Sequence, residues 1–412
     1  MRSYRDLFRT PEFTPFFLAY ATNTAALTMS GLALATLVYR DTGSPLLSAL
    51  SMFGPQLAQV LGATFLLSGA DRLPPRSTLA GVDFAFAVGT AALALPGLPL
   101  GAVFAVVFLQ GLIASLVGGV RGGLLNEILT KDGYVLGRSV FNMSSSLMQA
   151  IAFATGGALL TVLSPRACLL LSAALYAGSA LGIRLGLAAR PPRFTGRPSI
   201  RATWRTNRLL WSSRPRRLTY LGLWVPNGLI IGCESLYVSY APHAAGTLFA
   251  CAALGMLAGN LVVGRLVPPA LRPGLAVPLL LLLAMPYLIF ALRPDVFWAA
   301  LVVCVASGGF GASLVQVERL MSLTPDELTG HTLGLHGAGA LTMQGVSAVL
   351  AGTVAQLASP ATAMAVMAAT SVSVTLALAA AGRRRKRCPG VAGDGEPAAA
   401  SMPGDAEAGG DK

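Results

Sequence analysis

The sequence predicts an all-α integral membrane protein, with 12 transmembrane helices in two pseudo-symmetric six-helix bundles. Of its 412 residues, 54% are hydrophobic and only 11% are charged, whereas soluble domains carry roughly 25% charged residues. Apolar runs long enough to cross a hydrocarbon core of about 30 Å as helices recur along the chain. One long polar segment between residues 189 and 217 divides these runs into two sets of six.

The expected spans follow the apolar runs in order. They lie near residues 13–39, 45–68, 77–96, 99–121, 138–163, 166–188, 217–240, 243–264, 273–292, 296–319, 330–356 and 360–382. These positions predict four parts: an N-terminal six-helix bundle at 1–189, a cytoplasmic basic linker at 190–216, a C-terminal six-helix bundle at 217–382, and a cytoplasmic tail at 383–412. The Gly, Ala, Pro and acidic composition of the tail is typical of disorder. In the linker, Ile200, Trp204 and Trp211 share one helical face, which fits either a helix on an anionic inner leaflet or a solvated basic segment.

The two halves resemble each other in sequence. Residues 146–165 align without a gap on residues 341–360, so that Gly157 pairs with Gly352 and Gln149 with Gln344. A short charged corner with paired prolines also occurs in both halves, at residues 68–81 and 262–274. Repeats of this kind are one way in which transporters build a central pathway.

Basic residues are concentrated in the loops on one side of the membrane. If the N-terminus is cytoplasmic, the outer loops hold only Arg40, Arg166 and Arg293, and the other loop and terminal arginines lie inside. This positive-inside asymmetry predicts a multi-pass protein of the plasma membrane with both termini in the cytoplasm. It also accounts for the net charge of +13 without a nucleic-acid partner.

The charged corner after the second run resembles the signature loop of the major facilitator superfamily, roughly Gly-x-x-x-Asp-Arg-x-Gly-Arg-Arg. Asp71, Arg72 and Arg76 occupy its charged positions, while Leu67 stands where the first glycine is expected. The resemblance implies a gating loop whose aspartate sits against the cytoplasmic end of the eleventh helix in the outward-facing state. A helix N-terminus favours such an anion. Residues 152–157, Ala-Phe-Ala-Thr-Gly-Gly, keep the glycines but not the Gly-Pro pair of a second motif, which is associated with exporters.

Amide side chains within the spans mark candidate substrate contacts. They are absent from the third, sixth, ninth and twelfth runs, which the resemblance places toward lipid. Polar side chains at membrane depth face a cavity or a partner helix, so these residues either contact substrate or join helices. Those near mid-span are Asn23, Gln110, Gln149, Asn227 and Gln344.

Ionisable residues in the spans are candidates for proton coupling. Glu234 has no cationic residue nearby in its own run, so it is the first candidate, and Asp83 is the second. Arg121 lies on the same side as Asp83 and could pair with it, whereas Glu318 is expected to reach the inner interface. We treat Arg121 and Glu318 as candidates for charges between helices.

These features predict a secondary carrier that works by alternating access and exports a small organic molecule, a drug or metabolite, against proton entry. Proton-coupled uptake and a non-transporting membrane sensor are the alternatives. ATP-driven transport is disfavoured because the sequence has no Gly-x-x-x-x-Gly-Lys phosphate-binding loop. An enzyme is disfavoured because the five-residue spacing of His331 and His336 places them apart around a helix and no carboxylate pair accompanies them. The five scattered cysteines form no Cys-x-x-Cys pair, so neither metal nor cofactor is expected, and no obligatory protein partner is evident.

The arginine asymmetry gives a direct test of topology. Reporter domains fused after Thr195 and after Val391 are expected to read cytoplasmic, because both segments are strongly basic or follow a basic run. Activity of a reporter that works only outside the cell, at either site, would mean that the number of spans is wrong.

Overall fold

The structure is a computed structural model that describes residues 9–70, 73–129, 147–149, 151–191, 200–325 and 328–383. Within these ranges every regular element is a helix, and ten helical segments are long and apolar enough to cross a membrane. Helix α4 (Pro75–Leu93) and a shorter apolar helix at Leu147–Val162 stand at the positions of the remaining two expected spans. The predicted all-α membrane architecture is confirmed.

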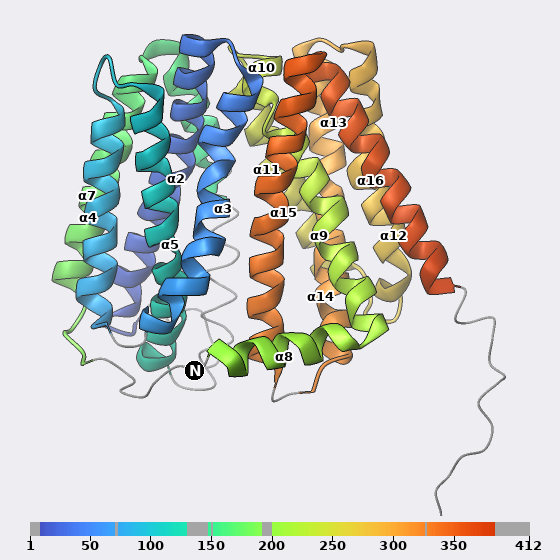
Figure 1. The fold of residues 1–412 in the computed structure, drawn as a ribbon, viewed down its shortest axis with the longest axis horizontal. Coiled ribbons are helices and arrows are strands. Elements are labelled where there is room, and N and C mark those ends of the chain that lie inside the picture. Colours follow the sequence, from blue (N-terminus) through green and yellow to red (C-terminus); the bar gives the residue numbers. More distant parts are fainter. Residues whose placement is uncertain are drawn as a thin grey trace, which may run out of the picture.

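The N-terminal half contains the first six expected spans (Figure 1). Prolines begin three of its helices, at Pro45, Pro75 and Pro165, where the missing N–H of the first turn costs nothing. Gly43 ends the first helix in the left-handed conformation, with φ of 64°, and its N–H donates to the Tyr39 carbonyl at 2.8 Å. Besides α4 and the helix at 147–162, the half consists of α2 (Phe13–Thr42), α3 (Pro45–Ala70), α5 (Leu100–Ile128) and α7 (Pro165–Gly186).

The C-terminal half is more often interrupted. Its seventh span breaks after Glu234, and 3₁₀ segments interrupt the ninth and tenth. The elements are α9 (Arg214–Glu234), α10 (Tyr237–Tyr240), α11 (Ala245–Leu261), a π-helical turn η1 (Val262–Leu266), α12 (Arg272–Ala284), η2 (Met285–Leu292), α13 (Val296–Ser307), η3 (Gly308–Gly311), α14 (Ala312–Ser322), α15 (Thr329–Leu357) and α16 (Pro360–Arg383).

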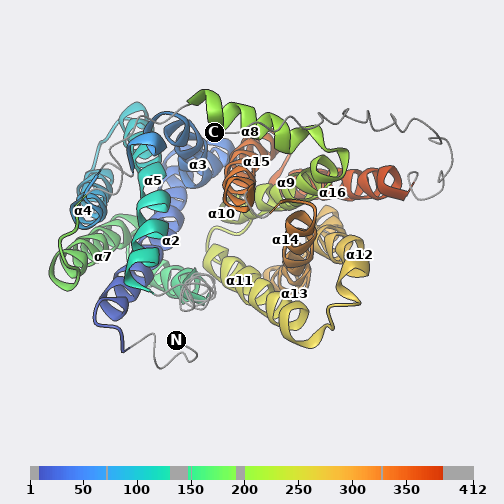
Figure 2. The same cartoon turned by 90° about the horizontal axis from the view of Figure 1, so that it is seen from below.

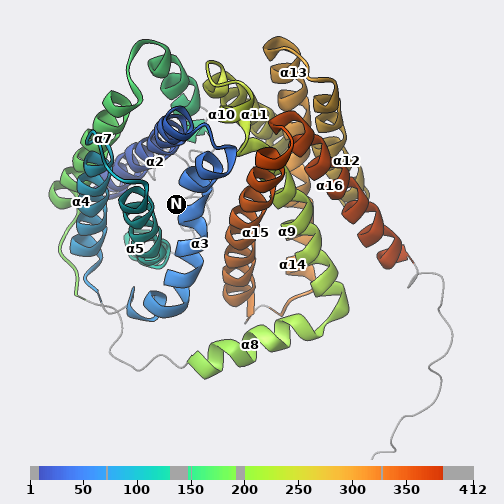
Figure 3. The same ribbon diagram turned by 45° about the horizontal axis from the view of Figure 1, so that its top comes forward.

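Helix α8 (Ile200–Ser212) lies across one end of the molecule, roughly perpendicular to the spans, as Figures 1 and 3 show. We call this the α8 end and the opposite one the gate end. The ring of Trp211 packs on Tyr220 and Trp224 of α9, with centroids 5.7 and 5.5 Å apart. The Arg216 guanidinium donates to the Leu209 carbonyl at 3.2 Å. The basic linker therefore contains a helix that is docked on the C-terminal half.

The two halves meet closely toward the gate end. Gly157, in the helix at 147–162, and Gly246, at the start of α11, approach so closely that a Cβ on either would lie within 3.0 Å of the other's backbone. A Cβ on Gly352 of α15 would lie 2.8 Å from the Cα of Leu46 on α3. We call these two contacts the glycine gate. Phe153 and Phe249 stack beside it with ring centroids 4.5 Å apart.

The glycine gate is built on the internal repeat. Gly157 and Gly352, which the gap-free alignment pairs, each face the first residues of a helix in the other half. Leu46 is the second residue of α3, and Gly246 is the second residue of α11. The second and eighth spans therefore play equivalent parts, as expected of two related bundles.

Alanine in the glycine gate is expected to hold the gate end apart, because a Cβ has no room there. Spin labels on Asp41→Cys and Ala358→Cys, both exposed, report the separation of the halves in a background without the native cysteines. We expect Gly157→Ala and Gly246→Ala to lengthen this distance and slow transport. Gly178→Ala on α7 is the matched control, since nothing lies within 4 Å of its added Cβ. An unchanged distance in both gate variants would show that the contact does not hold the halves together.

Candidate functional site

A hydrogen-bonded carboxyl group lies inside the N-terminal half. Asp83 on α4 is 2% exposed; Asn23 on α2 donates to its Oδ1 at 2.8 Å, and the Ser179 hydroxyl on α7 lies 2.5 Å from its Oδ2. The same hydroxyl lies 2.9 Å from the Ala19 carbonyl oxygen. One hydroxyl proton serves one acceptor well, so a protonated Asp83 that donates to Ser179 would leave Ser179 free to donate to Ala19. The geometry can therefore accommodate a proton on Asp83.

Arg121 lies near this group without touching it. Its guanidinium carbon is 4.4 Å from the centroid of the Tyr20 ring, a cation–π geometry. Arg121, Tyr20 and Asp83 line one small cavity. Among the residues that the structure describes, Arg121 and Asp83 form no ion pair within 4.0 Å, although both line this cavity.

Glu234 occupies the break in the seventh span. It is the last residue of α9, it is 9% exposed, and its Oε1 has no hydrogen-bond partner among the described residues. The α-helical bonding pattern ends there, because the Leu236 N–H donates to the Cys233 carbonyl, three residues back, at 3.1 Å, and a new short helix begins at Tyr237. In the described part of the chain no arginine or lysine pairs with Glu234.

The segment after Glu234 touches the other half of the protein. Helix α10 packs on α2 and α3, and the Tyr39 hydroxyl donates to the Ser239 carbonyl at 3.3 Å. Behind α10, the hydroxyl groups of Tyr237 and Tyr287 are in direct contact in the core. Separation of the halves at the gate end would therefore act on the chain five residues from Glu234.

The five amide candidates divide by their hydrogen bonds. Asn23 holds Asp83, and Gln110 on α5 donates to the Phe86 carbonyl at 3.3 Å and to the Thr90 hydroxyl at 3.2 Å on α4, so both join helices. Asn227 donates only to the Leu223 carbonyl of its own helix, at 2.7 Å, and its buried Oδ1 has no partner among the described residues. Gln149 and Gln344 are partly buried and have no hydrogen bond to another described residue. The last three retain hydrogen-bonding capacity.

Trp224 is a further candidate site residue that the structure shows and the sequence analysis did not identify. Its Nε1 donates toward the Nδ1 of His336 on α15, at 3.2 Å, and the His336 carbonyl, at 3.1 Å. The available signal was the pair Tyr220 and Trp224, one helical turn apart on a central span. His336 thus serves as an acceptor between α9 and α15. Within the described ranges, no three His, Cys, Asp or Glu side chains are grouped as a metal site.

Ion pairs hold the helix ends together at the α8 end. In the C-terminal half, Arg272 pairs with Glu318 at 2.5 Å and also donates to the carbonyls of Gly264 and Val267 at 3.0 and 3.2 Å. The second charged corner is therefore held against α14 by the pair between Arg272 and Glu318.

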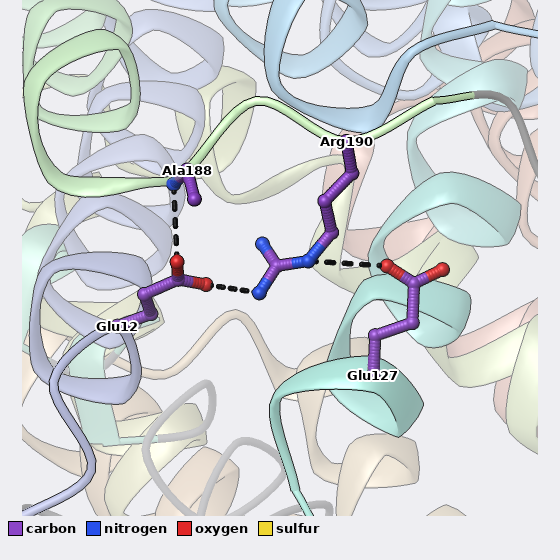
Figure 4. Close-up of polar contacts among 4 residues, drawn as sticks. All are labelled: Glu12, Glu127, Ala188 and Arg190. Carbon is purple, nitrogen blue, oxygen red and sulfur yellow. Dashed lines mark hydrogen bonds and ion pairs between the residues drawn. The ribbon is translucent and has the colours of Figure 1, made fainter.

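In the N-terminal half, Arg190 lies between Glu12 and Glu127, with nitrogen–oxygen distances of 2.5 and 3.4 Å (Figure 4). Arg76, a candidate for the gating loop, donates to the Arg184 carbonyl, and this bond joins the start of α4 to the end of α7. Asp71 and Arg72 lie outside the described residues, and so does any contact of the gating loop through them.

Comparison with known proteins identifies the family. The family model described as Major Facilitator Superfamily matches residues 16–243, which is more than half of the chain. The chain belongs to the major facilitator superfamily, a family of secondary transporters. No curated protein sequence matches the chain.

Solved structures share the fold along most of the chain. The peptide transporter POT in complex with sulfate has a TM-score of 0.68 at 16% identity, covering 91% of this chain and 94% of that one. A mutant of the nucleoside transporter NupG gives 0.70 at 13% identity, covering 89% and 98%. A bacterial homolog of the human lysosomal transporter Spinster, inward-facing and unoccupied, gives 0.65 at 14% identity, covering 90% and 94%. At such identities the likeness concerns the fold.

Ser179 is expected to stabilise the N-terminal half. Ser179→Ala removes a hydroxyl that bridges α7 to Asp83 and Ala19, and leaving buried groups unpaired costs about 1–3 kcal/mol. We expect a lower unfolding temperature of the purified protein in detergent. Ser373→Ala is the matched control, because that exposed hydroxyl bonds only to its own helix, at Ala369. Equal unfolding temperatures for the two variants would mean that the Asp83 cluster contributes little to stability.

Proposed function

We propose that this chain is a proton-coupled exporter of a small organic molecule, with the α8 end and both termini in the cytoplasm of a plasma membrane. The observation that carries the proposal is Glu234, a buried carboxyl group at the break of the seventh span that pairs with no described arginine or lysine. Proton coupling requires a group whose charge changes when the halves rock, and such a group is costly to bury in its charged form.

The glycine gate links protonation of Glu234 to the side of the membrane from which the proton comes. In the state with the gate closed, Glu234 is 9% exposed and pairs with none of the described cationic side chains. Closure therefore favours the protonated form, taken up from the outside while the gate is open. Opening at the gate end moves α10, which follows Glu234 directly, and gives the carboxyl group access to the outside again. A closed gate and a proton on Glu234 support each other.

The substrate class follows from side chains that retain hydrogen-bonding capacity. Asn227 lies seven residues before Glu234, two turns away on the same face of α9, and its Oδ1 is unpartnered. We propose that Asn227, Gln149 and Gln344 contact the substrate, with the Trp224 ring beside them. Amides next to an aromatic ring suit a neutral or weakly polar organic molecule, a drug or metabolite. Substrate arriving near Asn227 would displace the proton toward the cytoplasm.

The proposed gating loop acts in the conformation in which the gate end is open and the α8 end is closed. We assign Asp71, Arg72 and Arg76 to a latch that holds the α8 end closed while the gate end is open, with Asp71 against the start of α15. A helix N-terminus stabilises an adjacent anion by about 0.3–1 kcal/mol. Arg76 is bonded to the Arg184 carbonyl in the present state, so this side chain is held on the N-terminal half.

Uptake by proton symport is the second candidate. The solved structures of similar fold include proteins named as peptide and nucleoside transporters, and the same unpaired Glu234 could drive symport. Flux of a compound panel into inside-out vesicles, with and without an imposed pH gradient, separates the two. Export predicts accumulation in inside-out vesicles with an acidic lumen, and a non-transporting sensor predicts no flux in either orientation.

Glu234→Gln is expected to abolish accumulation driven by a pH gradient while sparing substrate counterflow. The amide keeps the shape of the side chain but fixes it in an uncharged form, so the gate can move without exchanging a proton. Both rates are measured in proteoliposomes with the compound identified by the panel. Glu318→Gln is the control, because that carboxylate is half exposed and paired with Arg272. If Glu234→Gln still concentrates substrate, Glu234 is not the coupling group and Asp83 is the next residue to replace.

A further inference from the structure

A basic pocket lies at the α8 end, where α4 begins and α7 ends. Its volume is about 210 Å³, far more than the ~10–15 Å³ that holds one water molecule. Helices α4 and α7 pack along each other at the outer edge of the N-terminal half, as Figure 2 shows from below. The pocket is lined by Pro74, Arg76, Ser77, Arg184, Ala189 and Arg190.

Three arginines lie around this pocket, and two of them have no acidic partner in the described part of the chain. Arg76 donates to the Arg184 carbonyl, but its buried Nε has no partner there. Arg184 is exposed and forms no ion pair with a described residue. The positive charge of Arg76 and Arg184 is therefore not neutralised by the described side chains.

Arg190 contributes a further free donor. Two of its nitrogens bind Glu12 and Glu127 (Figure 4), while the third, Nη1, is buried and has no partner among the residues that the structure describes. The Ala188 N–H donates to the other oxygen of Glu12 at 3.1 Å, so this carboxylate is already occupied on both sides. The pocket thus has guanidinium donors to spare.

Guanidinium groups around a pocket select an anion with several oxygens. The planar fork of arginine matches phosphate, which can accept from two or three such groups at once. The pocket also adjoins the N-terminus of α4, a 19-residue helix that begins with Pro75, and the free N–H groups of a first turn favour a negative charge. A phosphate group is the ligand that fits this chemistry.

The surface next to the pocket indicates the rest of the ligand. On α4, Phe84 and Val88 are 62% and 55% exposed and lie on the same helical face as Ser77. On α7, Leu181 and Leu185 are 58% and 77% exposed on either side of Arg184. Apolar side chains of this size face lipid in a membrane protein, so an acyl chain can follow them from the pocket.

We propose that this pocket binds the phosphate headgroup of an anionic phospholipid, whose acyl chains lie along the exposed faces of α4 and α7. Anionic lipids enrich the cytoplasmic leaflet, and basic pockets between helices at that level bind such headgroups. The assignment of the lipid to the cytoplasmic leaflet rests on the orientation in the proposed function. Binding of the lipid to the pocket does not rest on it. Failure of the transport assays and failure of lipid binding are therefore separate results.

The test uses the full-length purified chain in detergent, with lipid binding followed by native mass spectrometry during titration. The probes are dioleoyl phosphatidylglycerol, dioleoyl phosphatidylcholine and inorganic phosphate. We expect one phosphatidylglycerol to be retained in preference to phosphatidylcholine. Each arginine near a membrane surface strengthens binding of an anionic lipid by slightly more than about fivefold. Replacing Arg76 and Arg184 together by glutamine should therefore weaken the binding by about thirty-fold.

Two further variants make the result decisive. Arg319→Gln is the matched control, since it removes one charge from an exposed arginine at the same end but in the other half, and it should bind as the wild type. Ser77→Asp places a carboxylate in the pocket at an exposed first-turn position, where the helix tolerates it, and should also lose the lipid even if the double variant fails to fold. Equal retention by wild type and Ser77→Asp, or equal retention of the two lipids, would overturn the proposal. If millimolar inorganic phosphate displaces phosphatidylglycerol, the pocket binds a free anion, and the proposal of a lipid ligand is also overturned.

Discussion

The glycine gate is the constraint on which the observed arrangement of the halves depends. Gly157 against Gly246, and Gly352 against Leu46, bring backbones from the two halves to a separation that no Cβ permits. Such close packing lets small residues gain many weak contacts where no hydrophobic driving force separates helix from lipid. The segment after Glu234 takes part in the same closure, because α10 packs on α2 and α3 of the other half.

Glycines also make each half rigid. Within the N-terminal half, Gly62 and Gly111 let α3 and α5 touch along their backbones, and within the C-terminal half Gly255 and Gly259 do the same for α11 with α13 and η3. Close-packed backbones have little freedom to slide. Movement between conformations is then easiest at the gate, between the halves, and at the breaks of the seventh, ninth and tenth spans, which all lie in the C-terminal half.

Hydropathy, charge asymmetry and the internal repeat were sufficient to predict the helical membrane fold, because each is a local or periodic property of the chain. The repeat even paired Gly157 with Gly352, which occupy equivalent contacts in the gate. The partners of polar side chains were not predictable in this way. Asn23 and Asp83 are 60 residues apart, and Ser179 is a further 96 away, so nothing in their spacing indicates that one hydroxyl joins the cluster. The same holds for Glu234. The sequence shows that its own span has no cation nearby, but only the fold shows which other helices lie close enough to provide a cation.

The distribution of buried side-chain oxygens without a partner differs between the halves. In the N-terminal half, Asp83 is held by two side chains from different helices. Of the buried side-chain oxygens without a partner among the described residues, all but that of Gln56 lie in the C-terminal half, on α9, α11, α13, α14, α15 and α16. An unpaired buried group costs about 1–3 kcal/mol, so a bound water, proton or substrate that satisfies it stabilises the state in which it binds. The C-terminal half therefore has more buried oxygens that a proton, water or substrate could satisfy, and it is also the half whose helices are broken. We infer that the N-terminal half is the more rigid support and that binding and protonation act chiefly on the C-terminal half, from which the seventh span transmits them to the gate.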